Sequence, residues 1–183
     1  MEYGCVGFLE ISTIAKGIQV VDALVKKASV ELVLAYPFSS GRYLICFHGE
    51  VEDTKSAFIA GKHAADKSLI DSCLLPKIHS EVLSVLREQP KIQEMEALGI
   101  LETLTCSSCI LAADKSLKTS KVKLIKIHLG KGIGGKAYFV IEGEVEDVNS
   151  ALLESVRVLN GQGIIEKILI PQADPKLLGL FGS

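Results

Sequence analysis

Gly49-Glu50-Val51-Glu52-Asp53 recurs in the same order as Gly143-Glu144-Val145-Glu146-Asp147, so one five-residue stretch occurs twice in the chain. Both copies continue to a Ser-Ala pair, Ser56-Ala57 and Ser150-Ala151. At average residue frequencies, five matched positions arise by chance about once in a million comparisons. The stretch therefore indicates that the chain is a tandem duplication.

The repeat covers both halves of the chain. Eight residues of the first half reappear unchanged 92 positions later: Gly7, Leu9, Glu10, Ile18, Asp22, Lys26, Val30 and Leu32. After Ser40 the offset becomes 94, which places a two-residue insertion in the second copy. Near the end of each copy, Leu75-Pro76 parallels Ile170-Pro171. We therefore expect two domains, residues 1–90 and 91–183, with the polar stretch 87–96 as their linker.

Each half predicts the same order of elements. In the first half, strands are expected at 3–12, 30–37, 42–49 and 69–75, and the residues between the second and third strands read as a hairpin turn. The spacing of apolar residues predicts an amphipathic first helix, with a stripe made of Ile14, Ile18, Val21, Val25 and Ala28. A second helix follows Glu50–Asp53, whose acids suit a helix start as caps and dipole partners.

The second half repeats this order, with strands at 97–105, 122–128, 136–144 and 164–170 and helices between them. The order β-α-β-β-α-β, found twice, is the ferredoxin-like pattern. The predicted fold class is α/β, in the α+β sense, with two tandem ferredoxin-like domains.

Composition excludes several classes of protein. The 183 residues are 48% hydrophobic and 23% charged, with a formal net charge of −2. A membrane-spanning helix needs about 20 apolar residues in a row, whereas the longest run without a charge, residues 103–113, has 11 residues. The first ten residues do not have the pattern of a secretory signal. The near-zero net charge disfavours a nucleic-acid partner, so we expect a cytoplasmic protein that binds neither membrane nor nucleic acid.

Cys106 and Cys109 form a CxxC motif near the start of a predicted helix. This spacing is compatible with core packing, with redox sensitivity or with metal binding. Structural zinc requires four ligands, and the sequence has no second CxxC. The five cysteines are an odd number and stand mostly in apolar stretches, which favours reduced core residues and packing as the role of this pair.

No set of residues predicts catalysis. Gly130–Lys136 has the glycine and lysine spacing of a phosphate-binding loop, but Ala137 replaces the required hydroxyl residue and a strand follows. The four histidines at 48, 63, 79 and 128 do not have the spacing of a nucleophile-and-base site. We therefore predict no catalytic residue, no metal and no enzyme activity.

In their order, these motifs resemble the bacterial microcompartment shell proteins, specifically the tandem-domain, trimer-forming class. The likeness is greatest to the tandem shell protein of propanediol-utilisation compartments. It is carried by Gly7–Glu10 and Gly99–Glu102 in the first strands, Ala112–Lys115 in a helix, Gly132–Lys136 before a strand, the duplicated Gly-Glu-Val-Glu-Asp, and Leu75–His79.

The resemblance implies a homotrimer, in which six domains form a pseudohexameric tile. Such tiles pack edge to edge with other shell proteins and enclose enzymes in a cytoplasmic compartment, and a central pore passes small metabolites or electrons. Carried over to this sequence, the pore is lined by Phe38, Ser39, Ser40, Gly41, Lys131, Gly132, Ile133, Gly134 and Gly135.

Some tandem members hold a [4Fe–4S] cluster with one cysteine per chain from the pore loop of the first domain. In this sequence Ser39 stands at that position, and Fe–S clusters are held by thiolates, so we predict no cofactor. The alternative function is a tandem ligand-binding regulatory module similar to ACT or PII domains, which share the topology.

Overall fold

The computed structural model describes residues 4–88, 90 and 96–181, and these form two compact units. The first unit contains the residues up to Ile78, together with Thr105–Ser107 and Gly130–Gly135. The second unit contains the remaining residues from His79 onward. The linker predicted at 87–96 includes residues 89 and 91–95, which lie outside the described residues.

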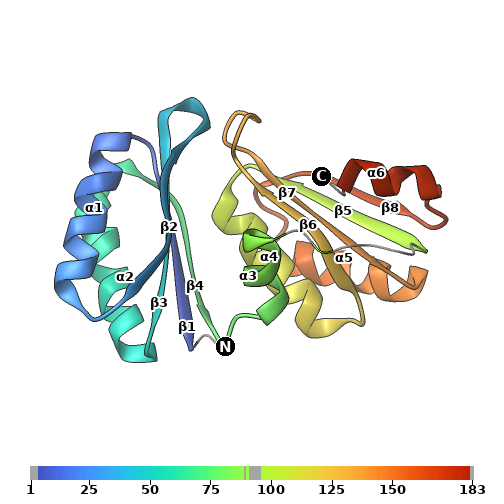
Figure 1. Ribbon diagram of the computed structural model, residues 1–183, viewed down its shortest axis with the longest axis horizontal. Helices are drawn as coiled ribbons and strands as arrows, with labels where there is room; N and C mark the ends of the chain where they lie inside the picture. The colour runs from blue at the N-terminus through green and yellow to red at the C-terminus, as the bar shows by residue number, and fades with distance from the viewer. Residues whose placement is uncertain (1–3, 89, 91–95, 182–183) are drawn as a thin grey trace. The chain divides into compact units, whose positions relative to one another are not determined.

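The first unit is a four-stranded antiparallel sheet with two helices on one face (Figure 1). Its elements are β1 (Cys5–Ile11), α1 (Ile14–Lys27), β2 (Glu31–Phe38), η1 (Ser39–Gly41), β3 (Arg42–Gly49), α2 (Val51–Ala65), η2 (Asp66–Ser68) and β4 (Leu69–Pro76). The strand order is β2-β3-β1-β4, which confirms the ferredoxin-like topology predicted for this half.

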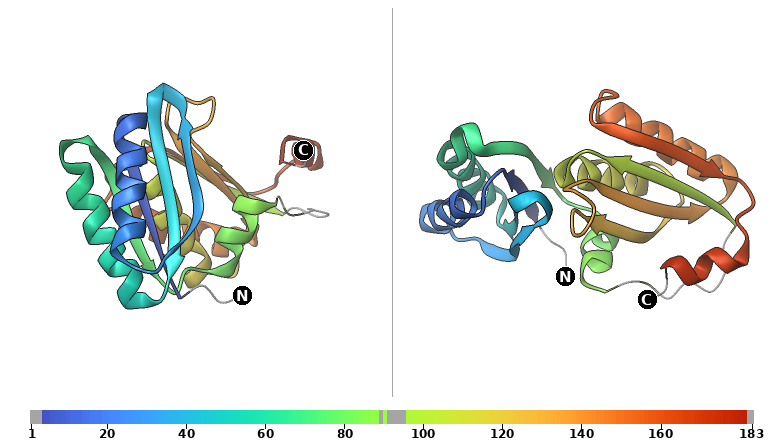
Figure 2. Two further views of the ribbon diagram at one scale, coloured as in Figure 1. Left: turned by 60° about the vertical axis from the view of Figure 1, so that its left-hand side comes forward. Right: turned by 90° about the horizontal axis from the view of Figure 1, so that it is seen from above.

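The second unit repeats the pattern, with strand order β6-β7-β5-β8. Its elements are α3 (Ser80–Arg87), β5 (Ala97–Thr103), α4 (Cys106–Thr119), β6 (Lys123–Leu129), β7 (Ala137–Gly143), α5 (Val145–Val158), β8 (Ile164–Ile170), η3 (Pro175–Leu177) and α6 (Leu178–Phe181). The pattern predicted neither α3 nor the C-terminal η3 and α6. Figure 2 shows the sheet and helices of each half from two further directions.

The core of the first unit lies between the sheet and the two helices. Leu9 and Phe47 from the sheet are fully buried against Val20 and Leu24 of α1 and against Ala57 of α2. Burying side chains of this size stabilises a fold by about 1.5–3 kcal/mol each. The apolar run predicted for the first strand therefore supplies the centre of this core.

The predicted apolar stripe of α1 is only partly its core face, because Val21 and Ala28 pack against the core but the other three residues do not. Ile14, Ile18 and Val25 are 41%, 57% and 40% exposed, whereas the buried residues of α1 are Gly17, Val20 and Leu24. Gly17 explains the difference, because a Cβ at this position would collide with the ring and Cβ of Tyr43. The sheet therefore contacts α1 closely at Gly17. The helix face that carries Ile14, Ile18 and Val25 stays on the surface.

The acids before α2 and α5 hold only one of their two predicted roles. Glu52 and Asp53 lie in the first turn of α2, where a negative charge opposes the helix dipole. Glu50 occupies the N-cap position, but its side chain makes no capping hydrogen bond, and the same holds for Glu144 before α5.

In the second unit, α3 protects the edge of the sheet. It packs against β6, and the carboxylate of Glu81 accepts a hydrogen bond from the backbone N–H of Leu124 at 3.0 Å. An edge strand otherwise presents unpaired backbone groups that invite pairing with another chain. The C-terminal segment packs on the same sheet, where Phe181 and Ala173 join a cluster around Leu98.

A charged pair lies inside the first sheet. Glu10 of β1 is fully buried, and its carboxylate accepts a hydrogen bond from the guanidinium of Arg42 at 2.7 Å and another from the backbone N–H of Cys106 at 2.8 Å. Burial raises the pKa of Glu10 above its usual range, although both hydrogen bonds act in the opposite direction. An isolated buried carboxylate is costly, so Arg42 is the group that makes this position tolerable.

We expect Arg42→Met to destabilise the protein by about 3 kcal/mol at pH 8, because it leaves a buried carboxylate without its cation. The substitution removes a group that lowers the pKa of Glu10, so the pKa of the folded state rises further. As the pH falls through that pKa, Glu10 takes up a proton in the folded state and the penalty shrinks. It is smallest near pH 4, where the unfolded carboxyl is also protonated. Urea unfolding of both proteins at pH 8, 6 and 5 measures the difference.

Glu10→Gln supplies the matched background, because its amide does not titrate, so Arg42→Met made in this background should cost the same free energy at each pH. A destabilisation by Arg42→Met that does not change with pH would contradict the assigned role of Arg42.

Candidate functional site

Two loops of unusual backbone geometry form the candidate site. In the connection between β2 and β3, Ser40 and Gly41 have φ angles of 64° and 72°. Between β6 and β7, Gly130, Gly132 and Gly134 have φ angles of 68°, 77° and 67°. Residues with side chains rarely adopt these angles, so the glycine-rich sequence of the second loop is what its conformation requires.

Within the first unit, the two loops contact each other. The backbone N–H of Gly132 donates a hydrogen bond to the hydroxyl of Ser39 at 2.6 Å. The ring of Phe38 lies so close to Gly130 that a side chain there would overlap it. These contacts link residues from the two copies of the repeat, and they join the two segments that the resemblance assigns to a pore.

Arg42 extends the connection from the loops to the sheet. Its Nη1 donates to the carbonyl of Gly135 at 3.3 Å, and the same atom contacts Glu10. Because Glu10 also accepts the N–H of Cys106, one carboxylate fixes both the loop end and the start of α4. Asp71, the cross-strand neighbour of Glu10, accepts a hydrogen bond from the hydroxyl of Thr105.

The predicted pore residues differ in their exposure. Lys131 and Ser40 are exposed, as are Gly41, Gly132 and Gly134. Ser39 and Ile133 are partly buried, whereas Phe38 and Gly135 are buried. The structure thus brings the two predicted segments together, with small polar groups and one ammonium on the surface and the Phe38 ring beneath them.

The sequence interpretation missed the residues that support these loops. Arg42, Asp71 and Thr105 were not singled out, although Glu10 belongs to the repeat through its counterpart Glu102. The available signal was a glutamate within an apolar strand, which recurs at the same place in both copies as Glu10 and Glu102.

The CxxC motif lies in the interior. Cys106 and Cys109 are both fully buried, and neither forms a disulfide. Burial raises the pKa of the Cys109 thiol far above its usual value. Because the thiolate is the reactive form of cysteine, this environment favours packing over redox or metal chemistry. Among the described residues, no group of three or more His, Cys, Asp or Glu side chains has the arrangement of a metal site.

Three of the histidines take part in local structural contacts. His79 accepts the N–H of Glu81 at the start of α3, and His128 stacks on Tyr138 with ring centroids 5.5 Å apart. His48 lies 3.4 Å from the carboxylate of Glu31. None of these three contacts pairs a histidine with a nucleophile.

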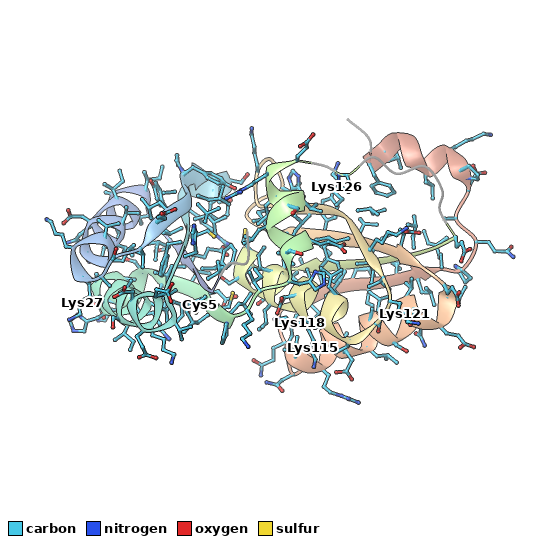
Figure 3. All side chains as sticks on the ribbon, turned by 60° about the horizontal axis from the view of Figure 1, so that its bottom comes forward. Cys5, Lys27, Lys115, Lys118, Lys121 and Lys126 are labelled. Atoms are coloured by element: carbon cyan, nitrogen blue, oxygen red, sulfur yellow. The ribbon has the colours of Figure 1, made fainter. Side chains whose placement is uncertain are left out.

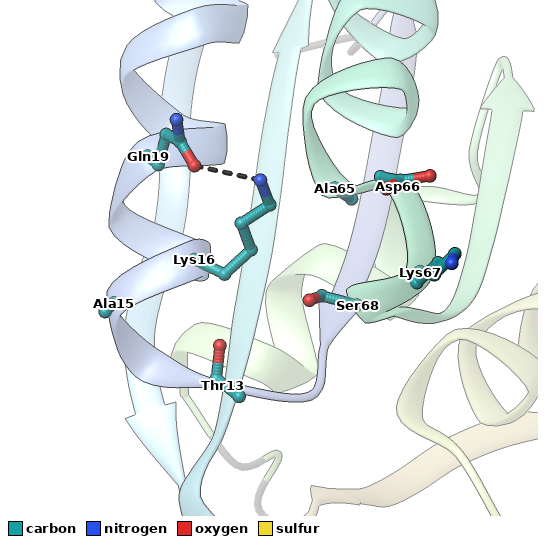
Figure 4. Close-up of a pocket in the computed structure, with 8 residues that line it drawn as sticks. All are labelled: Thr13, Ala15, Lys16, Gln19, Ala65, Asp66, Lys67 and Ser68. Atoms are coloured by element: carbon teal, nitrogen blue, oxygen red, sulfur yellow. Dashed lines mark hydrogen bonds between the residues drawn. The ribbon is translucent and has the colours of Figure 1, made fainter.

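An open depression of about 600 Å³ lies beside the start of α1 (Figure 4). Its lining includes Thr13, Lys16, Lys67 and Asp66, and the Lys16 ammonium donates to the side chain of Gln19 at 2.9 Å. These groups do not include a general base aimed at a nucleophile, so the depression does not have the character of an active site.

The lysines of α4 do not form an unopposed basic patch. Lys115 and Lys118 lie on this helix in the second unit (Figure 3). Lys118 pairs with Asp114 at 2.6 Å, and Lys115 lies 3.7 Å from Glu154. Neutralisation by neighbouring acids is unfavourable for phosphate binding. Within the described part of the chain, the helices are all too short or too polar to cross a membrane.

The chain was compared with known protein families and proteins. The family model described as the BMC domain matches it twice, at residues 5–78 and 97–173. The bacterial microcompartment shell protein PduT of Citrobacter freundii is 36% identical over 160 residues, which are 87% of each chain. The carboxysome shell protein CcmK4 of a Halothece species is 34% identical over 90 residues, covering 47% of this chain and 77% of that protein.

Solved structures give the same result. The crystal structure of a microcompartment protein from Desulfitobacterium hafniense DCB matches with a TM-score of 0.83 and 35% identity, over 96% of this chain and 98% of that one. A fused permuted hexameric shell protein from the RMM microcompartment has a TM-score of 0.66 at 21% identity, over 85% and 83% of the two chains, and supports the fold.

Both copies of the repeat match one family, so the regulatory-module alternative is not favoured. That family is structural, in agreement with the expectation that the chain is not an enzyme. The chain therefore belongs to the BMC-domain family of bacterial microcompartment shell proteins, and its role is that of a structural shell component.

Proposed function

We propose that three copies of the chain form a pseudohexameric shell tile with a central pore, lined by residues 38–41 and 131–135. Each chain carries two BMC domains, so three chains supply the six domains of a hexagonal tile. The observation that carries the pore assignment is the hydrogen bond from Gly132 to Ser39, which joins the two loops. In the proposal, other shell proteins flank the tile edges, and the shell encloses enzymes in a cytoplasmic compartment.

The loop chemistry supports passage of small polar or anionic metabolites. Lys131 is exposed at the tip of the glycine-rich loop, and three copies around an axis would bring three ammonium groups together. A narrow opening lined by one sign of charge raises the local concentration of ions of the opposite sign. The hydroxyl of Ser40 is also exposed on the first loop.

The proposed pore is free of metal. The resemblance places the ligand of a [4Fe–4S] cluster at position 39, where this chain has a serine. Its hydroxyl already accepts the N–H of Gly132 at 2.6 Å. Because iron–sulfur clusters are ligated by thiolates, the residue present does not fit the cluster.

Electron microscopy of concentrated protein tests the tile. We expect a trimer in sedimentation velocity at low concentration, and flat hexagonal arrays as concentration rises, because identical tiles present the same edge to every neighbour. Trimers that never form sheets and that bind a small molecule with micromolar affinity would instead indicate a regulatory module.

Spin labels test the pore assignment. A label on Lys131→Cys should show strong dipolar broadening, because the three labels of one trimer would lie close to a common axis. The native cysteines are buried, so labelling should be selective. A label on Lys27→Cys, at the end of α1, is the control and should give a narrower spectrum. Equal spectra from the two positions would refute the assignment.

Iron analysis tests the metal-free pore. Protein purified without oxygen should be colourless and contain no stoichiometric iron or sulfide. A brown protein with about four irons per trimer would contradict the proposal. Ser39→Cys provides the matched variant, since it restores the thiol while leaving the rest of the loop unchanged.

A further inference from the structure

Two acidic side chains in the first unit hold the start of a helix. Glu10 and Asp71 are cross-strand neighbours on β1 and β4. Glu10 accepts the backbone N–H of Cys106 at 2.8 Å, and Asp71 accepts the hydroxyl of Thr105. Carboxylates at a helix N-terminus satisfy its unpaired N–H groups and oppose its dipole. We call these four residues, Glu10, Asp71, Thr105 and Cys106, the first joint.

The repeat contains the acidic side of the first joint a second time. Glu102 and Glu166 are cross-strand neighbours on β5 and β8, at the same places in the second sheet. Lys136 stands at the position of Arg42, and its ammonium lies 3.3 Å from Glu102, as Arg42 lies 2.7 Å from Glu10. Two carboxylates and their cation are therefore reproduced.

The helix side is also reproduced, on α1. Thr13 and Ile14 lie 92 positions before Thr105 and Cys106, at the offset that the repeat sets. Thr13 is the N-cap of α1, and its side chain makes no capping hydrogen bond. We call Glu102 and Glu166, together with Thr13 and Ile14, the second joint. Both of its halves, the acids and the helix start, exist in the chain.

The acids of the second joint have partners within their own unit. Glu102 pairs with Lys136, and the Glu102 side chain is 34% exposed, whereas that of Glu10 is 0% exposed. Glu166 accepts a hydrogen bond from the N–H of its chain neighbour Lys167. The acids of the second joint are therefore open to a further donor.

The apolar residues beside α1 support the same conclusion. Ile14 and Ile18 are 41% and 57% exposed, whereas their counterparts Cys106 and Ile110 are fully buried. The sequence keeps this helix face apolar in both copies, but α1 presents it to solvent. Exposed apolar residues beside unused polar groups mark a surface that another protein covers.

We infer that Glu102 and Glu166 of one chain hold the start of α1, at Thr13 and Ile14, in a second copy of this chain. The occupant is a second copy because the complementary halves belong to one sequence, and the first joint shows how they fit. Such a contact pairs two different surfaces, so it repeats from copy to copy, and in the proposed trimer it closes into a ring of three. The inference rests on the proposed trimer and assigns its subunit contact.

Cross-linking tests the second joint in the full chain. Thr13→Cys and Glu166→Cys in one chain should give covalent dimers and trimers with a short thiol cross-linker. The linker is the shortest that closes Thr105→Cys with Asp71→Cys inside a single chain. Each single variant should stay uncross-linked, and a mixture of the two should give dimers but no trimers.

A second measurement uses charge. Glu102→Gln with Glu166→Gln should raise the concentration at which the trimer dissociates by about tenfold or more, because each joint loses charge-assisted hydrogen bonds. Glu146→Gln, in the exposed first turn of α5, is the control and should leave that concentration unchanged.

The outcomes separate the two proposals. A trimer that the double cysteine variant fails to cross-link, and whose dissociation the glutamines do not change, overturns the joint but leaves the tile. A chain that stays monomeric at every concentration overturns both. Cross-linking to dimers alone by the double variant indicates a two-fold contact and also overturns the inferred ring.

Discussion

The Glu10 carboxylate is the constraint on which the loop arrangement depends. It is fully buried in β1, yet it meets Arg42 and the N–H of Cys106. A buried acid in this position must be surrounded by donors, because desolvation is costly. Arg42 in turn contacts the carbonyl of Gly135. The hydrogen bonds of Glu10 and Arg42 therefore connect the sheet, the glycine-rich loop and the start of α4.

The two copies of the repeat have diverged around this centre in an informative way. Arg42 and Lys136 both neutralise the first-strand glutamate, but a guanidinium has several donors in a fixed plane and can serve two acceptors. Lys136 is a compact charge that lies farther from its partner. The first copy therefore holds a preformed contact, whereas the second keeps a looser pair whose carboxylate is accessible to a partner.

The repeat predicted the topology well because the spacing of apolar residues in each strand and helix is also what places those residues in the core. Every predicted strand is present, and β3 and β8 begin and end at the expected residues. The orientation of α1 was missed because two neighbouring faces of this helix are apolar, and only the contact of Gly17 with Tyr43 selects between them. The partners of Glu10 were also missed, because they come from residues 32 and 96 positions away. Sequence spacing does not reveal such pairings.

The two loops assigned to the proposed pore, residues 38–41 and 130–135, are fixed at their bases, and the second loop has a tip whose backbone can change conformation. Phe38 is buried beneath Gly130, and Ser39 holds the N–H of Gly132, so the bases of both loops are fixed. At Gly134, by contrast, nothing lies within 4 Å of where a Cβ would stand. Glycine at such open positions allows large backbone changes at little cost. A change in the width of the proposed pore would therefore involve the backbone around Gly134 and leave the contacts of Phe38 and Ser39 in place.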